Sequence, residues 1–209
     1  MKFFAYTLTE YHRVVHLDTD TLVLQPLDPL LDANESLLYT TDVNMANPSS
    51  PTMPVQGGFL VIRPDQAVFE DLVRVLKTTQ FNPVSGWGRS NIGLFWGGIT
   101  VQGILPYYYE HEAAPENKYR AVDRCIYNNM VDRQDCQKID VSNIRSAHFT
   151  NCQKPWLCVY PHPKQPLCSR LAERWFEMRN TAEHALGLED TVACPKGSPK
   201  EYSPMRLLR

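Results

Sequence analysis

Two acidic residues follow a short apolar run near the start of this sequence, and their spacing suggests metal chemistry. The run 14–17 has the composition of a buried strand, and Asp18-Thr19-Asp20 follows it directly. Side chains at positions i and i+2 of an extended chain point to the same side, so the two carboxylates are expected to face one ligand together. Like charges this close repel each other, and a bound divalent cation is the usual way to offset the repulsion.

Three kinds of site begin with such an acidic pair. A calcium loop is excluded, because its positions 6 and 12 would be Val23 and Pro29 rather than glycine and glutamate. A phosphatase of the haloacid dehalogenase type also starts with a strand and Asp-x-Asp, but its usual Gly-Thr continuation is replaced here by Thr21-Leu22. The third possibility is the metal-binding Asp-x-Asp of a nucleotide-sugar glycosyltransferase. The acidic pair alone does not choose between an enzyme site and a solvated acidic turn.

Short strands and helices must position this pair. Three apolar runs have strand length: 14–17, 37–41 and 58–62. Helices are expected over 3–11, after the capping residue Asp65, and from about 169 to 186. The helix after Asp65 would bury a face formed by Val68, Leu72, Val75 and Leu76. This alternation favours an α/β layer fold.

The centre of the chain is rich in glycine and aromatic residues. Because most of the ten glycines fall between positions 57 and 103, this centre is expected to be loop that packs closely against something. Neither common phosphate loop fits, since Asn91 stands where a dinucleotide loop needs glycine and Leu94 where a P-loop needs lysine. The aromatic residues here are expected to pack in the core, with stacking on an acceptor sugar as the alternative: Trp87, Phe95, Trp96 and Tyr107 to Tyr109.

The composition argues against nucleic-acid binding and against a membrane span. The chain has 21 Lys and Arg against 23 Asp and Glu, so it offers no broad positive field, and nucleic-acid binding is not expected. No window approaches the ~18 uninterrupted apolar residues that a membrane span requires.

The six cysteines indicate disulfides, because they are even in number and none has C-x-x-C spacing. Disulfides are typical of an oxidising compartment, and a glycosylation sequon, Asn34-Glu35-Ser36, supports such a location. The expected location is the secretory pathway or Golgi lumen, and the alternative is a cytoplasmic protein with free buried thiols. A bond between Cys152 and Cys158 would brace the segment between them, although the sequence does not fix the connectivity.

Four segments occur in a recognisable order along the chain. They are 11–24 (YHRVVHLDTDTLVL), 56–64 (QGGFLVIRP), 97–103 (GGITVQG) and 148–156 (HFTNCQKPW). This set resembles the glycogenin-like family of retaining glycosyltransferases, glycosyltransferase family eight. The resemblance covers residues 2–176, and the most specific of its motifs is His-x5-Lys-Pro-Trp.

The resemblance implies a GT-A-like α/β fold, with a mixed sheet flanked by helices. It also implies Mn²⁺-dependent, retaining transfer of a hexose or related sugar from a UDP-sugar donor to an unknown carbohydrate, protein or lipid acceptor. Asp18, Asp20 and His148 would be the metal ligands. Lys154 would contact the diphosphate and act in catalysis by stabilising charge on the departing UDP. Substrate binding would also involve Asp18, Thr19, Asp20, Gln56, Gly57, Gly58, Gln102 and Asn151, and Gln102 is the second candidate catalytic residue.

The chain departs from the family pattern at several points. The family places uridine-binding βαβ units before the first motif, so a catalytic domain truncated at its N-terminus is expected over 1–189, followed by a poorly ordered tail over 190–209. Gln56-Gly57-Gly58 replaces Asn-Ser-Gly, and Val101-Gln102 replaces Asp-Gln. Asn151 replaces a glycine, and asparagine tolerates the positive φ expected there. The alternative functions are a non-catalytic fragment without the donor pocket and the phosphatase.

Overall fold

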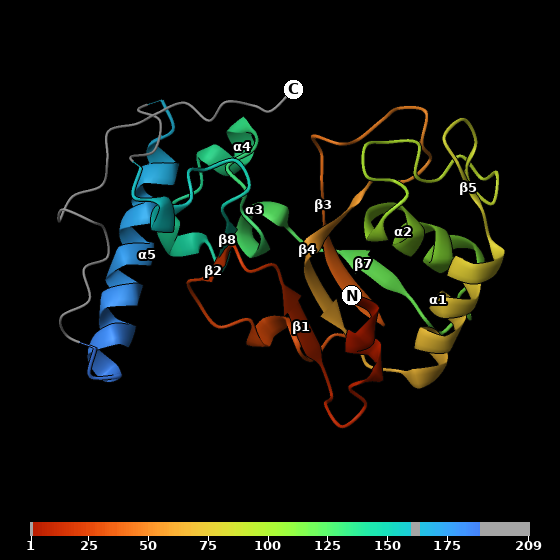
Figure 1. The fold of residues 1–209 in the computed structure, drawn as a ribbon, viewed down its shortest axis with the longest axis horizontal. Coiled ribbons are helices and arrows are strands. Elements are labelled where there is room, and N and C mark those ends of the chain that lie inside the picture. The colour runs from red at the N-terminus through yellow and green to blue at the C-terminus, as the bar shows by residue number, and fades with distance from the viewer. Residues whose placement is uncertain (1, 160–163, 189–209) are drawn as a thin grey trace.

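The computed structural model describes residues 2–159 and 164–188 (Figure 1). Its central sheet has the order β1-β4-β3-β7. The strands are β1 (Val14–Leu17), β4 (Val55–Ile62), β3 (Leu37–Thr41) and β7 (Tyr119–Ala121). β4 pairs antiparallel with both β1 and β3, and β7 pairs parallel with β3, so the sheet is mixed, as predicted. The proposed tail at 190–209 lies outside the described residues.

β4 is buried over all eight residues, and its two faces pack against different layers. Leu60 and Ile62 belong to the larger core, which includes Leu72 of α1 and Leu105 of α2. Phe59 and Val61 of the opposite face pack in a smaller core beside η2 (Asp28–Leu30). A strand covered on both faces is continuously apolar, which explains the run that predicts it.

α1 (Gln66–Thr78) begins where the sequence predicts. The Asp65 carboxylate accepts hydrogen bonds from the backbone N–H groups of Ala67 and Val68, which have no partner inside the helix. The predicted apolar face is buried except at Leu76, which is 45% exposed and lies in the wall of a cleft instead. η1 (Lys2–Thr7), a 3-10 helix shorter than the helix expected over 3–11, packs against α1.

The glycine-rich centre is only partly loop. β5 (Phe81–Asn82) and β6 (Gly86–Trp87) form a small hairpin. A helix that the sequence analysis did not predict, α2 (Val101–His111), begins at the end of the expected loop. The close packing is real, because a Cβ on Gly103 would lie 2.0 Å from the Gly98 carbonyl oxygen. Trp87 and the three consecutive tyrosines are buried in the core, as predicted, whereas Trp96 is 83% exposed.

A second group of elements lies beside the sheet, toward α5 (Pro166–Ala185) in Figure 1. β2 (Thr21–Val23) pairs antiparallel with β8 (Ser146–His148). The short helices here are α3 (Arg124–Tyr127), α4 (Gln134–Gln137), η3 (Val141–Asn143) and η4 (Pro155–Leu157). No helix in the described part of the chain is both long and apolar enough to cross a membrane.

Two disulfides join pairs of described residues in this second group. Cys125 bonds Cys136, and Cys152 bonds Cys168. The suggested pairing of Cys152 with Cys158 is therefore wrong. The observed bond ties the segment after β8 to the first turn of α5, which gives a larger closed loop than the suggested pair and fixes that segment to a helix.

Candidate functional site

The acidic pair lies in the turn between β1 and β2. The Asp18 N–H donates to the Gly58 carbonyl of β4 at 3.0 Å, and the Thr21 N–H donates back to the Asp18 carbonyl at 3.1 Å. In the β2–β8 ladder, Thr21 is opposite His148. The ladder therefore brings a histidine from late in the sequence to the carboxylates of Asp18-Thr19-Asp20.

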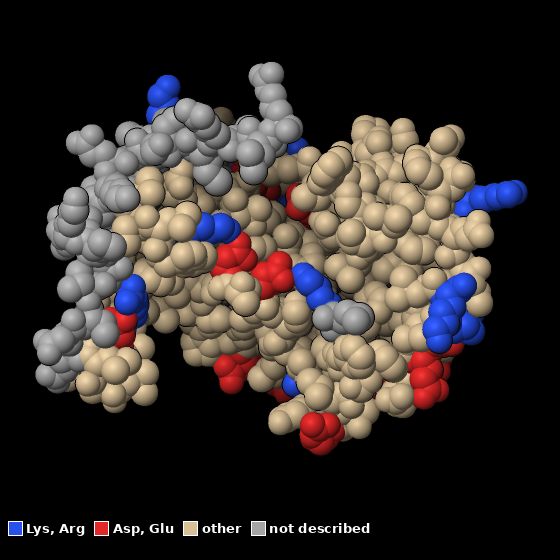
Figure 2. All heavy atoms as spheres, in the orientation of Figure 1, with Lys and Arg blue, Asp and Glu red and all other residues tan. Residues whose placement is uncertain are grey.

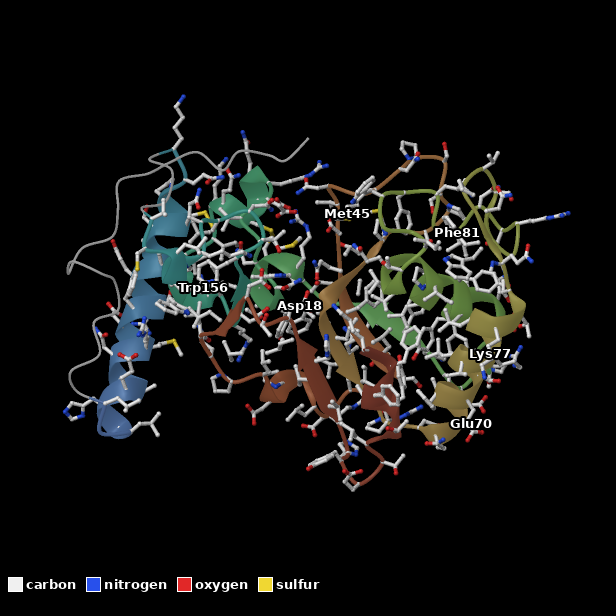
Figure 3. The ribbon with its side chains drawn as sticks, in the orientation of Figure 1. Asp18, Met45, Glu70, Lys77, Phe81 and Trp156 are labelled. Atoms are coloured by element: carbon white, nitrogen blue, oxygen red, sulfur yellow. A yellow bond between two sulfur atoms is a disulfide. The ribbon has the colours of Figure 1, made fainter. Side chains whose placement is uncertain are left out.

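Asp18, Asp20 and His148 lie together. One possible ligand atom from each residue lies within 4.8 Å of the other two. His148 Nε2 is 3.1 Å from the Asp20 Oδ1 atom. The imidazole is only 4% exposed, whereas both carboxylates are partly open to solvent (Figure 3, where Asp18 lies near the centre, with Trp156 toward α5).

Each carboxylate has its own ammonium group. Lys2 Nζ donates to Asp18 Oδ1 at 2.8 Å and to the Gly57 carbonyl at 2.6 Å. Lys154 Nζ donates to Asp20 Oδ2 and to the Phe149 carbonyl. Figure 2 shows acidic side chains between basic ones near the middle of this face. The sequence analysis missed Lys2, because a lone lysine sixteen positions before Asp18 belongs to no local spacing pattern.

The charges at this site are set by burial and by these contacts. Burial acts to raise the pKa of Asp20, but the Lys154 hydrogen bond and the His148 and Lys154 charges outweigh it, so the pKa is lowered. Burial lowers the pKa of His148, and the nearby carboxylates offset this only in part. Asp20 is therefore ionised at neutral pH and the His148 imidazole is neutral, which are the protonation states that metal ligands require.

The absence of a side chain at position 58 makes room for this cluster. A Cβ on Gly58 would lie 2.6 Å from His148 Cε1 and 2.8 Å from Asp18 Oδ2. His148 Nδ1 is buried and has no hydrogen-bond partner among the described residues. Two carboxylates and one imidazole are a suitable donor set for a divalent transition metal.

The predicted substrate residues are in three places. Gln56 lies beside the cluster, where its Oε1 accepts from the Gly58 N–H at 2.5 Å and from Asn128 Nδ2 at 3.4 Å. Thr19 is exposed between the two carboxylates. Gln102 lies in the same cleft wall as Asp18 and directs its Nε2 to Met45 Sδ at 3.2 Å. The sequence analysis missed Asn128, which is buried and also donates to Thr40 at 2.9 Å.

Asn151 does not adopt the conformation expected of it. Its φ is not among the positive values of the described residues, so the predicted left-handed turn is absent at this position. Its side-chain Nδ2 donates to the Met130 carbonyl at 3.2 Å, which holds the turn after β8 without a positive φ. Where the family pattern has a glycine, this chain therefore holds the turn by a side-chain hydrogen bond.

A cleft of about 620 Å³ opens beside the acidic cluster. Its polar end is formed by Lys2, Asp18, Gln56, Gly57, Gly58 and Gln102. Its apolar wall comes from η1, α1 and the first turn of α2, and includes Phe4, Leu76 and Val101. The cluster therefore lies at the charged end of a cavity large enough for a small organic molecule.

Comparisons with known proteins support the fold class. No family model matches the chain, and no curated protein matches it. Two crystal structures of the glycosyltransferase GlyE from Streptococcus pneumoniae TIGR4, one of them in the apo form, are each 15% identical over 85% of this chain, with a TM-score of 0.50. A bifunctional glycosyltransferase, WbbM in its apo form, is 18% identical over 74% of this chain, with a TM-score of 0.47.

The likeness to GlyE shows that this chain shares the fold of that glycosyltransferase. The match covers only 46% of the GlyE chain and 32% of the WbbM chain, so this chain spans less than half the length of the proteins that it resembles. Because so few residues are identical, the likeness to GlyE concerns the path of the backbone and not the residues of the site.

Proposed function

We propose that this chain is the metal-binding and diphosphate-binding part of a retaining glycosyltransferase of family eight, which transfers a hexose or related sugar from a UDP-sugar. The observation that carries the proposal is the convergence of Asp18, Asp20 and His148 within 4.8 Å, with one lysine on each carboxylate. The fold shared with the glycosyltransferase GlyE supports this proposal over the phosphatase alternative.

Asp18, Asp20 and His148 would hold Mn²⁺. Two hard carboxylate ligands with one imidazole suit manganese better than calcium, which prefers oxygen ligands throughout. When bound, the ion would act as a Lewis acid that stabilises negative charge on the departing diphosphate.

Lys2 and Lys154 would bind the diphosphate. The two carboxylates and the two ammonium groups sum to zero charge, so a bound divalent ion would give the site a net charge of +2. That charge complements the diphosphate of a UDP-sugar. With the carboxylates held by the metal, both ammonium groups could turn to phosphate oxygens.

Gln56 and Gln102 would donate hydrogen bonds to sugar hydroxyl groups at the polar end of the cleft. Thr19, between the two carboxylates, and Asn151, three residues after His148, would contact the donor. By its resemblance to family eight, the reaction is displacement on one face of the sugar, in which the acceptor hydroxyl attacks while UDP leaves and its phosphate takes the proton. The disulfides favour a compartment of the secretory pathway over the cytoplasm.

Calorimetric titration of the full chain with Mn²⁺ and then UDP tests the proposal. His148→Ala should weaken Mn²⁺ binding by at least tenfold, because it removes one ligand. Lys154→Ala should leave Mn²⁺ binding within a few-fold and weaken UDP binding. Lys77→Ala, at an exposed lysine in the last turn of α1, is the matched control and should change neither affinity.

Binding is measured here rather than turnover, so a chain that lacks further parts of the donor pocket still gives an answer. Unchanged UDP binding in both the His148 and the Lys154 variants would refute the proposal. Formation of a beryllium fluoride adduct on Asp18, which mimics an aspartyl phosphate, would favour the phosphatase instead.

A further inference from the structure

The sequon Asn34-Glu35-Ser36 takes no part in the site described above. Asn34 is exposed in the turn between η2 and β3, and its backbone carbonyl accepts from Arg63 Nη1 at 3.0 Å. We propose that Asn34 is a site of N-linked glycosylation, and that the oligosaccharide is added to the nascent chain before β3 joins the sheet. This inference does not depend on the proposed transferase activity.

The modification forms one bond and breaks one. Asn34 Nδ2 would form a bond to C1 of the first sugar of a polyisoprenyl-diphosphate-linked oligosaccharide. The bond between C1 and the phosphate oxygen breaks, and the diphosphate leaves with the electron pair. The amide loses one proton, which the leaving diphosphate takes up, so no oxidant or reductant is needed.

The folded chain blocks this reaction at Ser36, the hydroxyl residue that the sequon requires. Ser36 is 1% exposed. Its Oγ donates to Asn117 Oδ1 at 2.7 Å and accepts from Arg63 Nη2 at 2.7 Å. The hydroxyl is therefore buried and occupied on both sides once β3 has paired with β4 and β7.

The order of synthesis leaves the sequon accessible for a time. Arg63 lies 27 residues after Ser36, and Asn117 lies 81 residues after it. β7 begins at Tyr119 and pairs parallel with β3, so the pocket around Ser36 cannot close until that late segment has been made. Throughout this interval, the Ser36 hydroxyl lacks its Asn117 partner and β3 lacks its β7 neighbour, so a glycosylating enzyme could bind the sequon.

Two further observations fit the proposal. The disulfides Cys125–Cys136 and Cys152–Cys168 belong to an oxidising compartment, and N-linked glycosylation takes place in such a compartment. The glycan would also stay clear of the cleft. Leu37, three residues after Asn34, is opposite Ile62 in the β3–β4 ladder. Gly58, at the polar end of the cleft, lies four residues before Ile62 on β4, and four residues of strand span roughly 13 Å.

The test is expression of the full chain behind a cleavable secretory leader in a eukaryotic cell line. Secreted and intracellular fractions are both digested with an N-glycosidase in ¹⁸O-water and analysed by peptide mass spectrometry. The wild-type chain should carry the label at Asn34 and shift in mobility on digestion. Asn34→Gln should abolish both signals. Glu35→Gln, which keeps the sequon intact at the adjacent position, should retain them and is the matched control.

A second arm tests the timing. The folded chain with both disulfides formed is incubated with microsomal membranes that contain the oligosaccharide donor, beside the same chain reduced and unfolded. The unfolded chain should be modified, and the folded chain should not. Unlabelled Asn34 in wild-type chain that has formed its disulfides would overturn the proposed site, and equal modification of the folded chain would overturn the proposed order of events.

Discussion

Replacement of Gly58 by alanine should weaken metal binding without removing any ligand. The added Cβ would lie 2.6 Å from His148 Cε1 and 2.8 Å from both Asp18 Oδ2 and Gln56 Oε1. Real Cβ atoms do not approach other atoms this closely, so the imidazole and the Asp18 carboxylate must move apart. Overpacking of this kind costs about 1–3 kcal/mol. If the strain is relieved by moving these ligands, Mn²⁺ affinity should fall by about 5- to 150-fold, at 1.4 kcal/mol per factor of ten.

Gly57→Ala is the matched control for this substitution. Gly57 is the preceding residue on the same buried strand, and its added Cβ would lie 2.8 Å from Val101 Cγ2 and 3.3 Å from Lys2 Nζ. The control therefore introduces strain on the opposite face of β4, away from His148. It also crowds Lys2, the partner of Asp18, but displacing that ammonium group from Asp18 does not lower the affinity for a cation. Both variants should lower the melting temperature, but only Gly58→Ala should lower the Mn²⁺ affinity.

Calorimetry of Mn²⁺ binding and thermal unfolding, measured on the same preparations, decides this prediction. A Gly58→Ala chain that binds Mn²⁺ as tightly as the wild type would refute the inference that Gly58 makes room for the ligands. Equal loss of affinity in the Gly57 variant would show that the effect comes from general destabilisation of β4.

Three further predictions concern stability. Replacing Cys152 and Cys168 together by alanine should lower the free energy of unfolding by roughly 3 kcal/mol, which is the chain-entropy value for a closed loop of this length. Urea titrations of the oxidised proteins measure this difference, and no loss would mean that the bond does not constrain the unfolded chain. Asp65→Ala should cost about 1 kcal/mol through loss of the α1 cap, whereas Asp65→Asn should cost less. Burial raises the pKa of Asp42, so as the pH rises from the ordinary aspartate pKa to the raised value, the unfolded chain loses its proton first and stability falls. Asp42→Asn should remove that part of the pH dependence, and an unchanged stability profile from pH 3 to 7 would contradict it.

Local pattern was sufficient for several elements of the fold. The strand run 37–41 matches β3 from end to end, and Asp65 caps α1 as predicted, because both signals depend on neighbours within a few residues. α2 was missed for the opposite reason. Gly103, Pro106 and consecutive tyrosines are poor helix formers, and the helix forms because Ile104, Leu105 and the tyrosines are buried against β4.

The candidate site divides in the same way. The spacing of Asp18 and Asp20 shows from sequence that the two carboxylates share a side, and the resemblance added His148 and Lys154. Lys2 could not be predicted from the sequence. Its ammonium group reaches Asp18 because η1 lies beside the start of β4. Asn128 was missed as well, because its partners Thr40 and Gln56 lie 88 and 72 residues earlier in the sequence.

The sequence by itself determined the acidic pair, the main strands, the helix after Asp65 and an even set of cysteines, because each of these is set by residue type and short-range spacing. Only the tertiary structure decided that Thr21 lies opposite His148, that Cys152 bonds Cys168, and that each carboxylate has its own lysine. These contacts depend on ladder register and on which layers share a core, and such long-range choices follow from burial summed over the whole chain rather than from any local segment.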